Sequence, residues 1–266
     1  MAADGAARPH LPTRRARGAP ALRGRGAAGP RAHRRDRPVA ALSGAPAPRR
    51  ILVAHGTRSA PGIATVRAIT GAVSRRTGPV EVAFVDVRGP SPSQLLREDG
   101  RPTVLVPAFL AAGYHVRTDV PRHIAESGHP AVTVAASLGP DRALVGALLR
   151  RLDEAGRRPG DAIVLGATGS SDPDARADVR TMAAYLAEAV GGPVPVGFLA
   201  AGAPTVSEAV AAARAPGTRV FVAAYQLAEG LFHTRLAEAG ADAVAAPLGT
   251  APEVIDLLVA RFAQSR

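Results

Sequence analysis

The sequence contains no cysteine, no lysine and no asparagine among its 266 residues. Without cysteine the chain has no disulfide, no thiolate metal site and no cysteine nucleophile. Without lysine it cannot use Schiff-base chemistry or the lysine-containing phosphate loop of many nucleotide-binding proteins. It also lacks an uncharged apolar run of about 18 residues, so we expect no membrane span. Histidine and the carboxylates remain as the groups for chemistry near neutral pH.

The positive charge is concentrated near the N-terminus. The formal net charge is +11, and residues 1–50 hold twelve arginines against two aspartates. The remainder is nearly neutral, so its charge gives no reason to expect nucleic-acid binding. Residues 1–50 also contain no aromatic residue and are rich in Arg, Ala, Gly and Pro. Such a segment buries too little apolar surface to offset its ordering entropy, and we expect a disordered tail.

Two arginine pairs in this tail resemble a twin-arginine signal, but no apolar segment follows either pair. The alternatives are a solvated tail, a start codon assigned too far upstream, and an arm that binds a polyanion.

From residue 51 onward, short β-branched runs alternate with alanine-rich segments of helical character, a pattern that predicts parallel sheets of βαβ units. The polar segment 157–160 is the expected boundary between two domains. The predicted strands are Ile51–Ala54, Val80–Asp86, Thr103–Ala108, Val132–Ala136, Ala162–Leu165, Val194–Leu199, Arg219–Ala224 and Ala241–Ala245. The predicted helices are Ile63–Arg76, Arg142–Ala155, Ala175–Val190 and Pro252–Phe262.

The two sides of this boundary are similar in sequence. Residues 51–59 parallel residues 163–171, and residues 113–117 parallel residues 230–235, in the same order and at nearly constant offset. We therefore expect two similar α/β domains with mostly parallel sheets, facing each other across a central cleft. The expected division is a tail at 1–50, a half that carries the chemistry at 51–156, and a second half at 161–266.

Two histidines and an aspartate follow predicted strands of the first half. His55 and Asp86 end strands, and His115 follows an apolar loop that begins at Phe109. Ligands of open parallel sheets bind at the carboxyl ends of the strands, so we expect these three side chains to share a site. Two imidazoles and a carboxylate suit a first-row divalent ion with open positions. The second half has Thr168 in place of His55.

Each of these residues also has a purely structural explanation. His55 and Asp86 could cap turns or a helix, and the apolar loop before His115 could pack on a neighbouring helix. Four arginines flank the histidines and could pair with carboxylates of a ligand or remain solvated. They are Arg58, Arg117, Arg122 and Arg235. The segment 170–172 could line the opposite wall or cap a helix.

Four motifs together resemble the sirohydrochlorin chelatases of siroheme and cobalamin biosynthesis, over about residues 50–262. They are His55-Gly56-Thr57-Arg58-Ser59, Ala83-Phe84-Val85-Asp86, the segment Val106–Val116 that ends in Gly-Tyr-His-Val, and Gly169-Ser170-Ser171-Asp172-Pro173-Asp174-Ala175. The resemblance implies two flavodoxin-like halves around a tetrapyrrole cleft.

The resemblance also implies roles for individual residues. His55 and His115 match the two catalytic histidines that bind the metal. Asp86 stands where the family usually has glutamate as a further ligand, a departure by one methylene. Tyr114, in the apolar loop, would face the macrocycle. Arg58, Arg117 and Arg235 would bind its carboxylates.

The predicted function is insertion of Fe²⁺ or Co²⁺ into sirohydrochlorin, by a cytoplasmic lyase that needs no cofactor beyond the metal substrate. The predicted partners are the tetrapyrrole and the divalent ion, with no nucleic acid and no membrane. A carrier of metal or tetrapyrrole without turnover is one alternative. A histidine phosphatase is another, although Ala54 stands where that motif requires arginine. His233, the repeat partner of His115, is expected to touch substrate at most.

Overall fold

The first strand begins within the segment predicted to be a tail. The structure is a computed structural model that describes residues 47–265, so most of the predicted tail lies outside the described residues. Arg49 and Arg50, however, are buried in strand β1 (Arg49–Ala54), and the predicted boundary at residue 50 was wrong there. Burial of the Arg49 side chain is possible because its guanidinium binds the carboxylates of Glu81 and Glu98 at 2.5 and 2.6 Å.

The described residues form two four-stranded sheets with the same strand order, β2-β1-β3-β4 and β6-β5-β7-β8. Every neighbouring pair is parallel, and the order matches that of flavodoxin-like sheets. The predicted fold class, two similar α/β halves with parallel sheets, is therefore confirmed. The other strands are β2 (Glu81–Phe84), β3 (Thr103–Pro107), β4 (Val132–Val134), β5 (Ala162–Gly169), β6 (Val196–Ala201), β7 (Val220–Ala224) and β8 (Ala243–Val244).

The four predicted helices are present, and shorter helices join them. The predicted ones are α1 (Ala60–Thr77), α4 (Leu144–Glu154), α5 (Pro173–Val190) and α8 (Pro252–Gln264). The additional ones are α2 (Pro92–Leu96), the π-helix η1 (His115–Asp119), α3 (Val120–Ser127), α6 (Val206–Ala213), α7 (Leu231–Leu236) and the 3₁₀ helix η2 (Ala237–Ala239). Within residues 47–265, no helix combines the length and apolarity that a membrane crossing requires.

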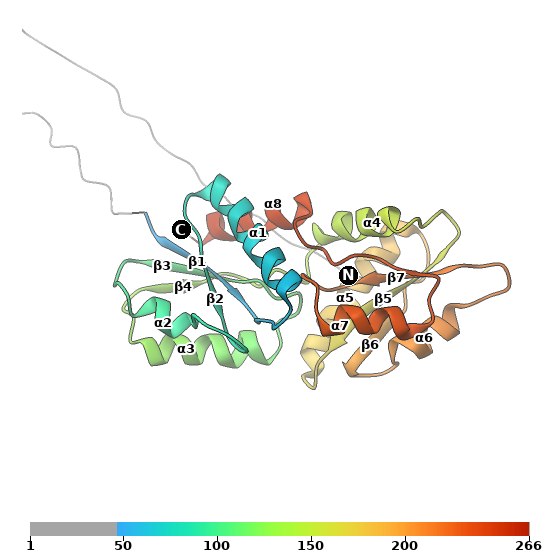
Figure 1. Cartoon of the computed structure of the whole chain (residues 1–266), viewed down its shortest axis with the longest axis horizontal. Coiled ribbons are helices and arrows are strands. Elements are labelled where there is room, and N and C mark those ends of the chain that lie inside the picture. The colour runs from blue at the N-terminus through green and yellow to red at the C-terminus, as the bar shows by residue number, and fades with distance from the viewer. Residues whose placement is uncertain (1–46, 266) are drawn as a thin grey trace, which may run out of the picture. The chain divides into compact units, whose positions relative to one another are not determined.

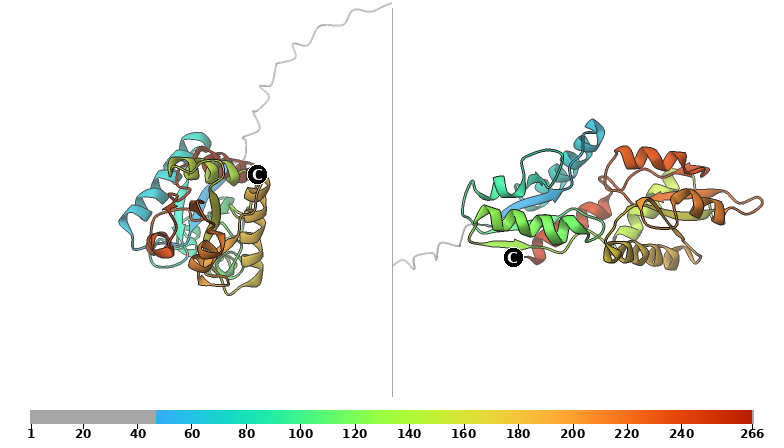
Figure 2. Two further views of the ribbon diagram at one scale, coloured as in Figure 1. Left: turned by 90° about the vertical axis from the view of Figure 1, so that its right-hand side faces the viewer. Right: turned by 90° about the horizontal axis from the view of Figure 1, so that it is seen from below.

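The last helix of each sequence repeat packs on the sheet of the other repeat. Helix α4 precedes the boundary at 157–160, yet it contacts β7 and α5. Helix α8 ends the chain, yet it contacts α1 and β3 of the first sheet, as Figures 1 and 2 show from three directions. The segments 51–156 and 161–266 are thus sequence repeats that exchange their final helices.

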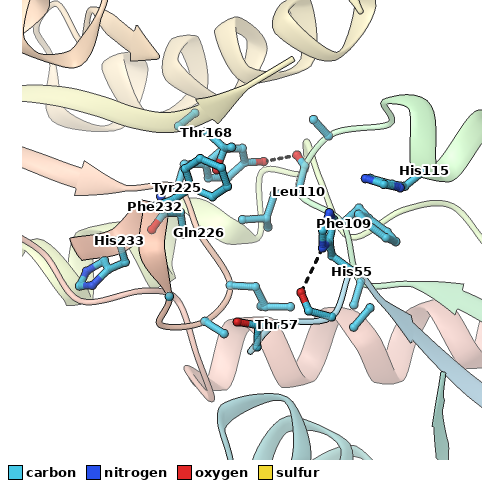
Figure 3. A pocket seen from close by; sticks show the side chains of 18 of the residues that line it. His55, Thr57, Phe109, Leu110, His115, Thr168, Tyr225, Gln226, Phe232 and His233 are labelled. Carbon is cyan, nitrogen blue, oxygen red and sulfur yellow. Dashed lines mark hydrogen bonds between the residues drawn. The ribbon is translucent and has the colours of Figure 1, made fainter. Parts of the chain in front are cut away.

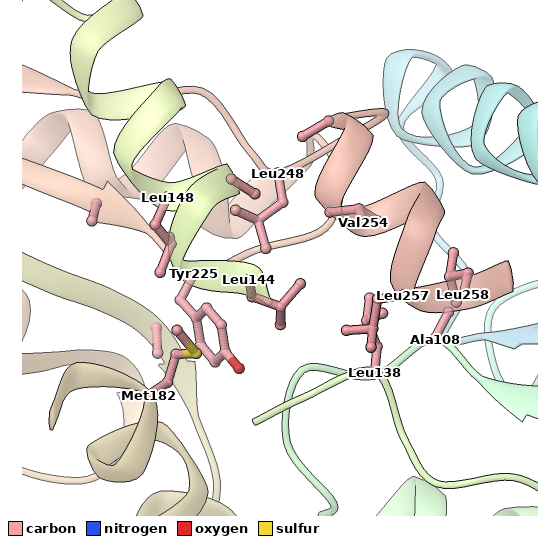
Figure 4. Close-up of a cluster of buried hydrophobic side chains, with 14 of the residues drawn as sticks. Ala108, Leu138, Leu144, Leu148, Met182, Tyr225, Leu248, Val254, Leu257 and Leu258 are labelled. Atoms are coloured by element: carbon pink, nitrogen blue, oxygen red, sulfur yellow. The ribbon is translucent and has the colours of Figure 1, made fainter. Parts of the chain in front are cut away.

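One hydrophobic cluster extends through both halves. It includes Leu52 and Val106 of the first sheet and Leu165 and Phe221 of the second, all at most 2% exposed. Figure 4 shows how α4 and α8 bring leucines such as Leu148 to this cluster. Because the apolar core is shared, the two sheets are held with their strand ends near a common space.

Candidate functional site

A pocket of about 760 Å³ lies at the carboxyl ends of the central strands of both sheets. Its walls include Ala54 and Ala108, which end or follow β1 and β3, and Ala167 and Tyr225 at the ends of β5 and β7. This is the edge at which open parallel sheets bind ligands, and the volume is within the usual range for small-molecule sites.

His55 is placed in the pocket by a tight turn at the end of β1. Gly56 follows it with φ +101°, and a Cβ on Gly56 would lie 2.1 Å from the carbonyl oxygen of Asp86. Only glycine fits this conformation and this close approach. The Nδ1 atom of His55 donates to the carbonyl oxygen of Gly56 over 3.0 Å, which leaves Nε2 without a proton in the neutral ring.

Replacing Gly56 by alanine is expected to destabilise the fold by at least about 1–3 kcal/mol, from backbone strain alone. The overlap with the Asp86 carbonyl adds to this cost because a backbone atom cannot yield easily. Gly128→Ala is the matched control, since Gly128 has φ +67° and a Cβ added there would meet nothing within 4 Å. Urea unfolding measures the free energy of unfolding of both variants. An equal loss in the two would contradict the role given to the close approach between Gly56 and the Asp86 carbonyl.

His115 joins His55 from the other central strand of the first sheet. It is the first residue of the π-helix η1, after the loop that leaves β3. The two imidazole rings have centres 4.5 Å apart at an interplanar angle of 86°, so the structure brings the predicted pair together. Figure 3 shows both rings beside Phe109 on one side of the pocket, with Tyr225, Gln226 and His233 opposite.

Asp119 holds the ring of His115, a contact that the sequence analysis did not identify. Its carboxylate accepts from Nδ1 of His115 at 2.6 Å and from Nη2 of Arg122 at 2.8 Å. Burial by itself would raise the pKa of Asp119, but these two hydrogen bonds outweigh it and hold the pKa below its usual range. The carboxylate is therefore an ionised acceptor, and Nδ1 of His115 is the donor. The spacing of four residues on one helical face was the available signal.

In the neutral form, both histidines therefore carry the proton on Nδ1 and leave Nε2 as the nitrogen that can bind an ion. An ion bound to one ring nitrogen lies about 3.2 Å from the ring centre, since the metal–nitrogen bond is about 2.1 Å and the ring radius about 1.1 Å. Two rings that share an ion would have centres about 4.5 to 5.2 Å apart for nitrogen–metal–nitrogen angles of about 90° to 110°. The observed separation of 4.5 Å between the ring centres of His55 and His115 lies at the short end of this range.

Asp86 does not join the two histidines in this structure. Strand β2 ends at Phe84, two residues earlier than predicted. The backbone of Asp86 then passes close to Gly56. The Oδ1 atom of Asp86 accepts from the backbone N–H of Val87 at 2.7 Å, and Asp86 is not among the residues that line the pocket. Across residues 47–265, no three His, Asp or Glu side chains are grouped closely enough to hold a metal ion.

The predicted substrate-binding residues are divided between the pocket and other contacts. Arg58 and Tyr114 line the pocket and are exposed at its rim. Arg117 does not line it, because its guanidinium binds the carboxylates of Asp174 and Asp172 from the second half. Arg235 is exposed on α7, outside the pocket lining.

The opposite wall is largely apolar. Leu231 and Phe232 of α7 are 63% and 37% exposed and form part of the rim, and sequence analysis did not identify them. Nε2 of His233 donates to the carbonyl oxygen of Ala245 at 3.1 Å. Gln226 is 7% exposed, and neither polar atom of its side chain has a hydrogen-bond partner. Thr168, at the repeat position of His55, also lines this wall.

The segment 170–172 fulfils both functions considered for it. Ser170 lines the pocket, and its hydroxyl accepts from the backbone N–H of Asp172 at 3.1 Å. Asp172 is the N-cap of α5, and its carboxylate accepts from the backbone N–H of Asp174 at 2.9 Å.

The CbiX family model matches residues 49–155 and 162–265 of the chain. Among solved structures, SirB from Bacillus subtilis with Fe³⁺ is 22% identical, with a TM-score of 0.72 over 82% of this chain and 96% of that chain. SirB from Bacillus subtilis subspecies spizizenii with cobalt is 20% identical, with a TM-score of 0.67 over 82% and 95%. A CbiX described as the terminal enzyme of siroheme biosynthesis in denitrifying bacteria is 21% identical, with a TM-score of 0.62 over 82% and 99%. No curated protein matches the chain in sequence. At these identities the structures establish a common fold.

Proposed function

The chain belongs to the CbiX family, and on this premise we propose that it inserts a divalent metal ion into sirohydrochlorin. The observation that carries the proposal is the pair of imidazoles of His55 and His115, which line one pocket with ring centres 4.5 Å apart and with Nδ1 of each ring in a hydrogen bond. The similar structures support it, since they include chelatases described with iron and with cobalt. Fe²⁺ and Co²⁺ are the proposed metal substrates.

The proposed reaction exchanges an ion for two protons. Two pyrrole N–H bonds of the macrocycle break, the ring nitrogens bind the ion, and two protons leave. His55 and His115 would hold the ion through Nε2 while it loses water, and a ring released by the ion can accept a pyrrole proton. No electron changes hands, so the balance requires no redox cofactor and no nucleotide, and we propose that none is used.

The pocket suits a flat, largely apolar substrate. Its rim exposes Val87 and Tyr114 from the first half and Leu231 and Phe232 from the second. An exposed group of apolar side chains around a cavity is typical of a binding site. We propose that these side chains contact the faces of the macrocycle and that Arg58 binds one of its carboxylates, by a charge-assisted hydrogen bond.

The test is anaerobic incubation of the protein with sirohydrochlorin and either Fe²⁺ or Co²⁺, followed by visible absorption of the macrocycle. Catalytic insertion should exceed the rate without protein and continue over many turnovers. A stoichiometric change without turnover would instead indicate a carrier. Hydrolysis of a phosphate ester without insertion would indicate a phosphatase, although buried Ala54 stands where that motif has arginine.

His233→Ala is expected to change the reaction only modestly. KM should rise by no more than about fivefold, the usual effect of losing one hydrogen bond to substrate. Its Nε2 is engaged with Ala245, and it lacks a second histidine because Thr168 occupies that position. Initial rates over a range of sirohydrochlorin concentrations measure KM and kcat. Loss of Co²⁺ binding as complete as in His115→Ala would show that both halves supply ligands.

A further inference from the structure

The loop that leads to His115 is held by hydrogen bonds from both halves of the chain. Residues 109–114 connect β3 to η1 and consist of Phe, Leu, Ala, Ala, Gly and Tyr. These side chains offer no hydrogen bond within the loop except through the Tyr114 hydroxyl. Backbone carbonyl groups of the loop accept hydrogen bonds from its own half, Phe109 from the N–H of Gly139 and Gly113 from that of Val116, each at 3.0 Å. Its last residue directly precedes His115.

Two side chains of the second half bind the backbone of this loop. The hydroxyl of Tyr225 donates to the carbonyl oxygen of Leu110 at 2.7 Å, a contact drawn in Figure 3. The Oδ2 atom of Asp178 accepts from the backbone N–H of Ala112 at 2.8 Å. Next along the loop, Gly113 lies so close to α5 that an added Cβ would be 3.3 Å from Cβ of Ala175.

Both side chains are set on rigid elements. Tyr225 follows β7, is 4% exposed and belongs to the shared hydrophobic cluster. Burial, with Asp178 and Asp141 nearby, raises the pKa of Tyr225 far above its usual value, so the phenol stays a donor at every working pH. Asp178 is half-buried within α5, which begins at the N-cap Asp172.

We propose that Tyr225 and Asp178 are positioning residues for His115, so that the second half contributes to the distance between the two histidines. This inference rests on the proposed function. The second half has Thr168 and Ala200 where the first has His55 and Asp86. It lacks this histidine and this aspartate, yet Tyr225 after β7 and Asp178 of α5 bind the loop that leads to His115.

A positioning role differs from simple stabilisation in what it changes. Loss of either hydrogen bond lets the loop, and with it the backbone of His115, move relative to His55. The ring of His115 keeps its bond to Asp119, which lies in the same π-helix and moves with it. The Co²⁺ affinity of the pair should therefore fall, along with kcat. KM for the tetrapyrrole should rise as well, because the same loop lines the pocket, so Co²⁺ affinity is the readout that tests positioning.

The variants are Tyr225→Phe, which removes only the hydroxyl, and Asp178→Ala. Asp178→Asn is the conservative variant, since its amide oxygen can still accept from Ala112. Glu253→Gln is the matched control, because it weakens the 2.6 Å pair between Arg150 of α4 and Glu253 of α8, away from the pocket lining. Each protein is assayed for insertion kinetics, Co²⁺ titration by visible absorption, and thermal unfolding.

We expect Tyr225→Phe and Asp178→Ala each to bind Co²⁺ about fivefold more weakly and to lose kcat by a similar factor, with Asp178→Asn close to the wild type. Glu253→Gln should match the wild type in both. Equal Co²⁺ affinity in all four variants would overturn the proposal, even if Tm falls. If the wild-type chain inserts no metal, the proposed function fails. The positioning role is then still tested by Co²⁺ titration and by the ring NMR chemical shifts of His115, each compared between the wild type and the variants.

Discussion

Replacing His55 or His115 by alanine is expected to lower kcat for metal insertion by at least about a hundredfold, the usual effect of a general acid–base group. Both rings line the same pocket with centres 4.5 Å apart, and we propose that each holds the ion through its own Nε2, so neither can replace the other. The fold should survive, because His55 is exposed and the side chain of His115 is 31% exposed.

The measurement is initial rate of insertion with Fe²⁺ or Co²⁺, together with thermal unfolding to establish that each variant is folded. His233→Ala is the matched control because it removes an imidazole from the opposite wall of the same pocket. If the histidines act as a unit, the double variant should be little worse than either single one. A double variant with near-normal turnover would refute the assignment of the chemistry to this pair.

The fold could be predicted because its signals are local. Strands such as Ile51–Ala54 are short apolar runs between breakers, and the repeat specified two copies of one sheet. The exchange of α4 and α8 between the two sheets could not be predicted, because each is an amphipathic helix that could cover either sheet. Which sheet a helix covers depends on the path of the chain after β4 and β8.

Of the predicted metal ligands, the sequence placed the two histidines together but not the aspartate. Strand ends of a parallel sheet meet at one edge, and this rule alone placed His55 and His115 together. It did not place the carboxylate of Asp86, although the backbone N–H of Asp86 donates to the carbonyl oxygen of His55 at 3.0 Å, just beyond the ends of both strands. The turn then directs the carboxylate of Asp86 to the N–H of Val87.

The arginines show a second limit of sequence reasoning. A guanidinium pairs equally well with a carboxylate of a ligand or of the protein. Arg117 binds Asp174, which is 57 residues away in the chain, and only the packing of α5 beside η1 reveals it. Arg58 has no such partner among the ion pairs of the described residues, and it alone among the predicted arginines lines the pocket.

Asp119→Ala is expected to weaken Co²⁺ binding by about 10- to 100-fold, the usual effect of losing the carboxylate that orients a metal-binding histidine. Without this acceptor, Nδ1 of His115 no longer has to carry the proton, so the neutral ring can place it on Nε2 and rotate away from His55. The His115–Asp119 hydrogen bond of 2.6 Å and the 6% exposure of Asp119 make this orientation firm.

Asp119→Asn separates orientation from charge, because its amide oxygen can still accept from Nδ1 and its volume is unchanged. It should retain more Co²⁺ affinity than Asp119→Ala. Asp99→Asn is the matched control, since it weakens a pair of Asp99 with Arg101 at 2.8 Å, away from the pocket lining. Co²⁺ titration by visible absorption compares the three variants. Wild-type affinity in Asp119→Ala would mean that the backbone of η1 alone orients His115, and the carboxylate would then be a structural partner of Arg122.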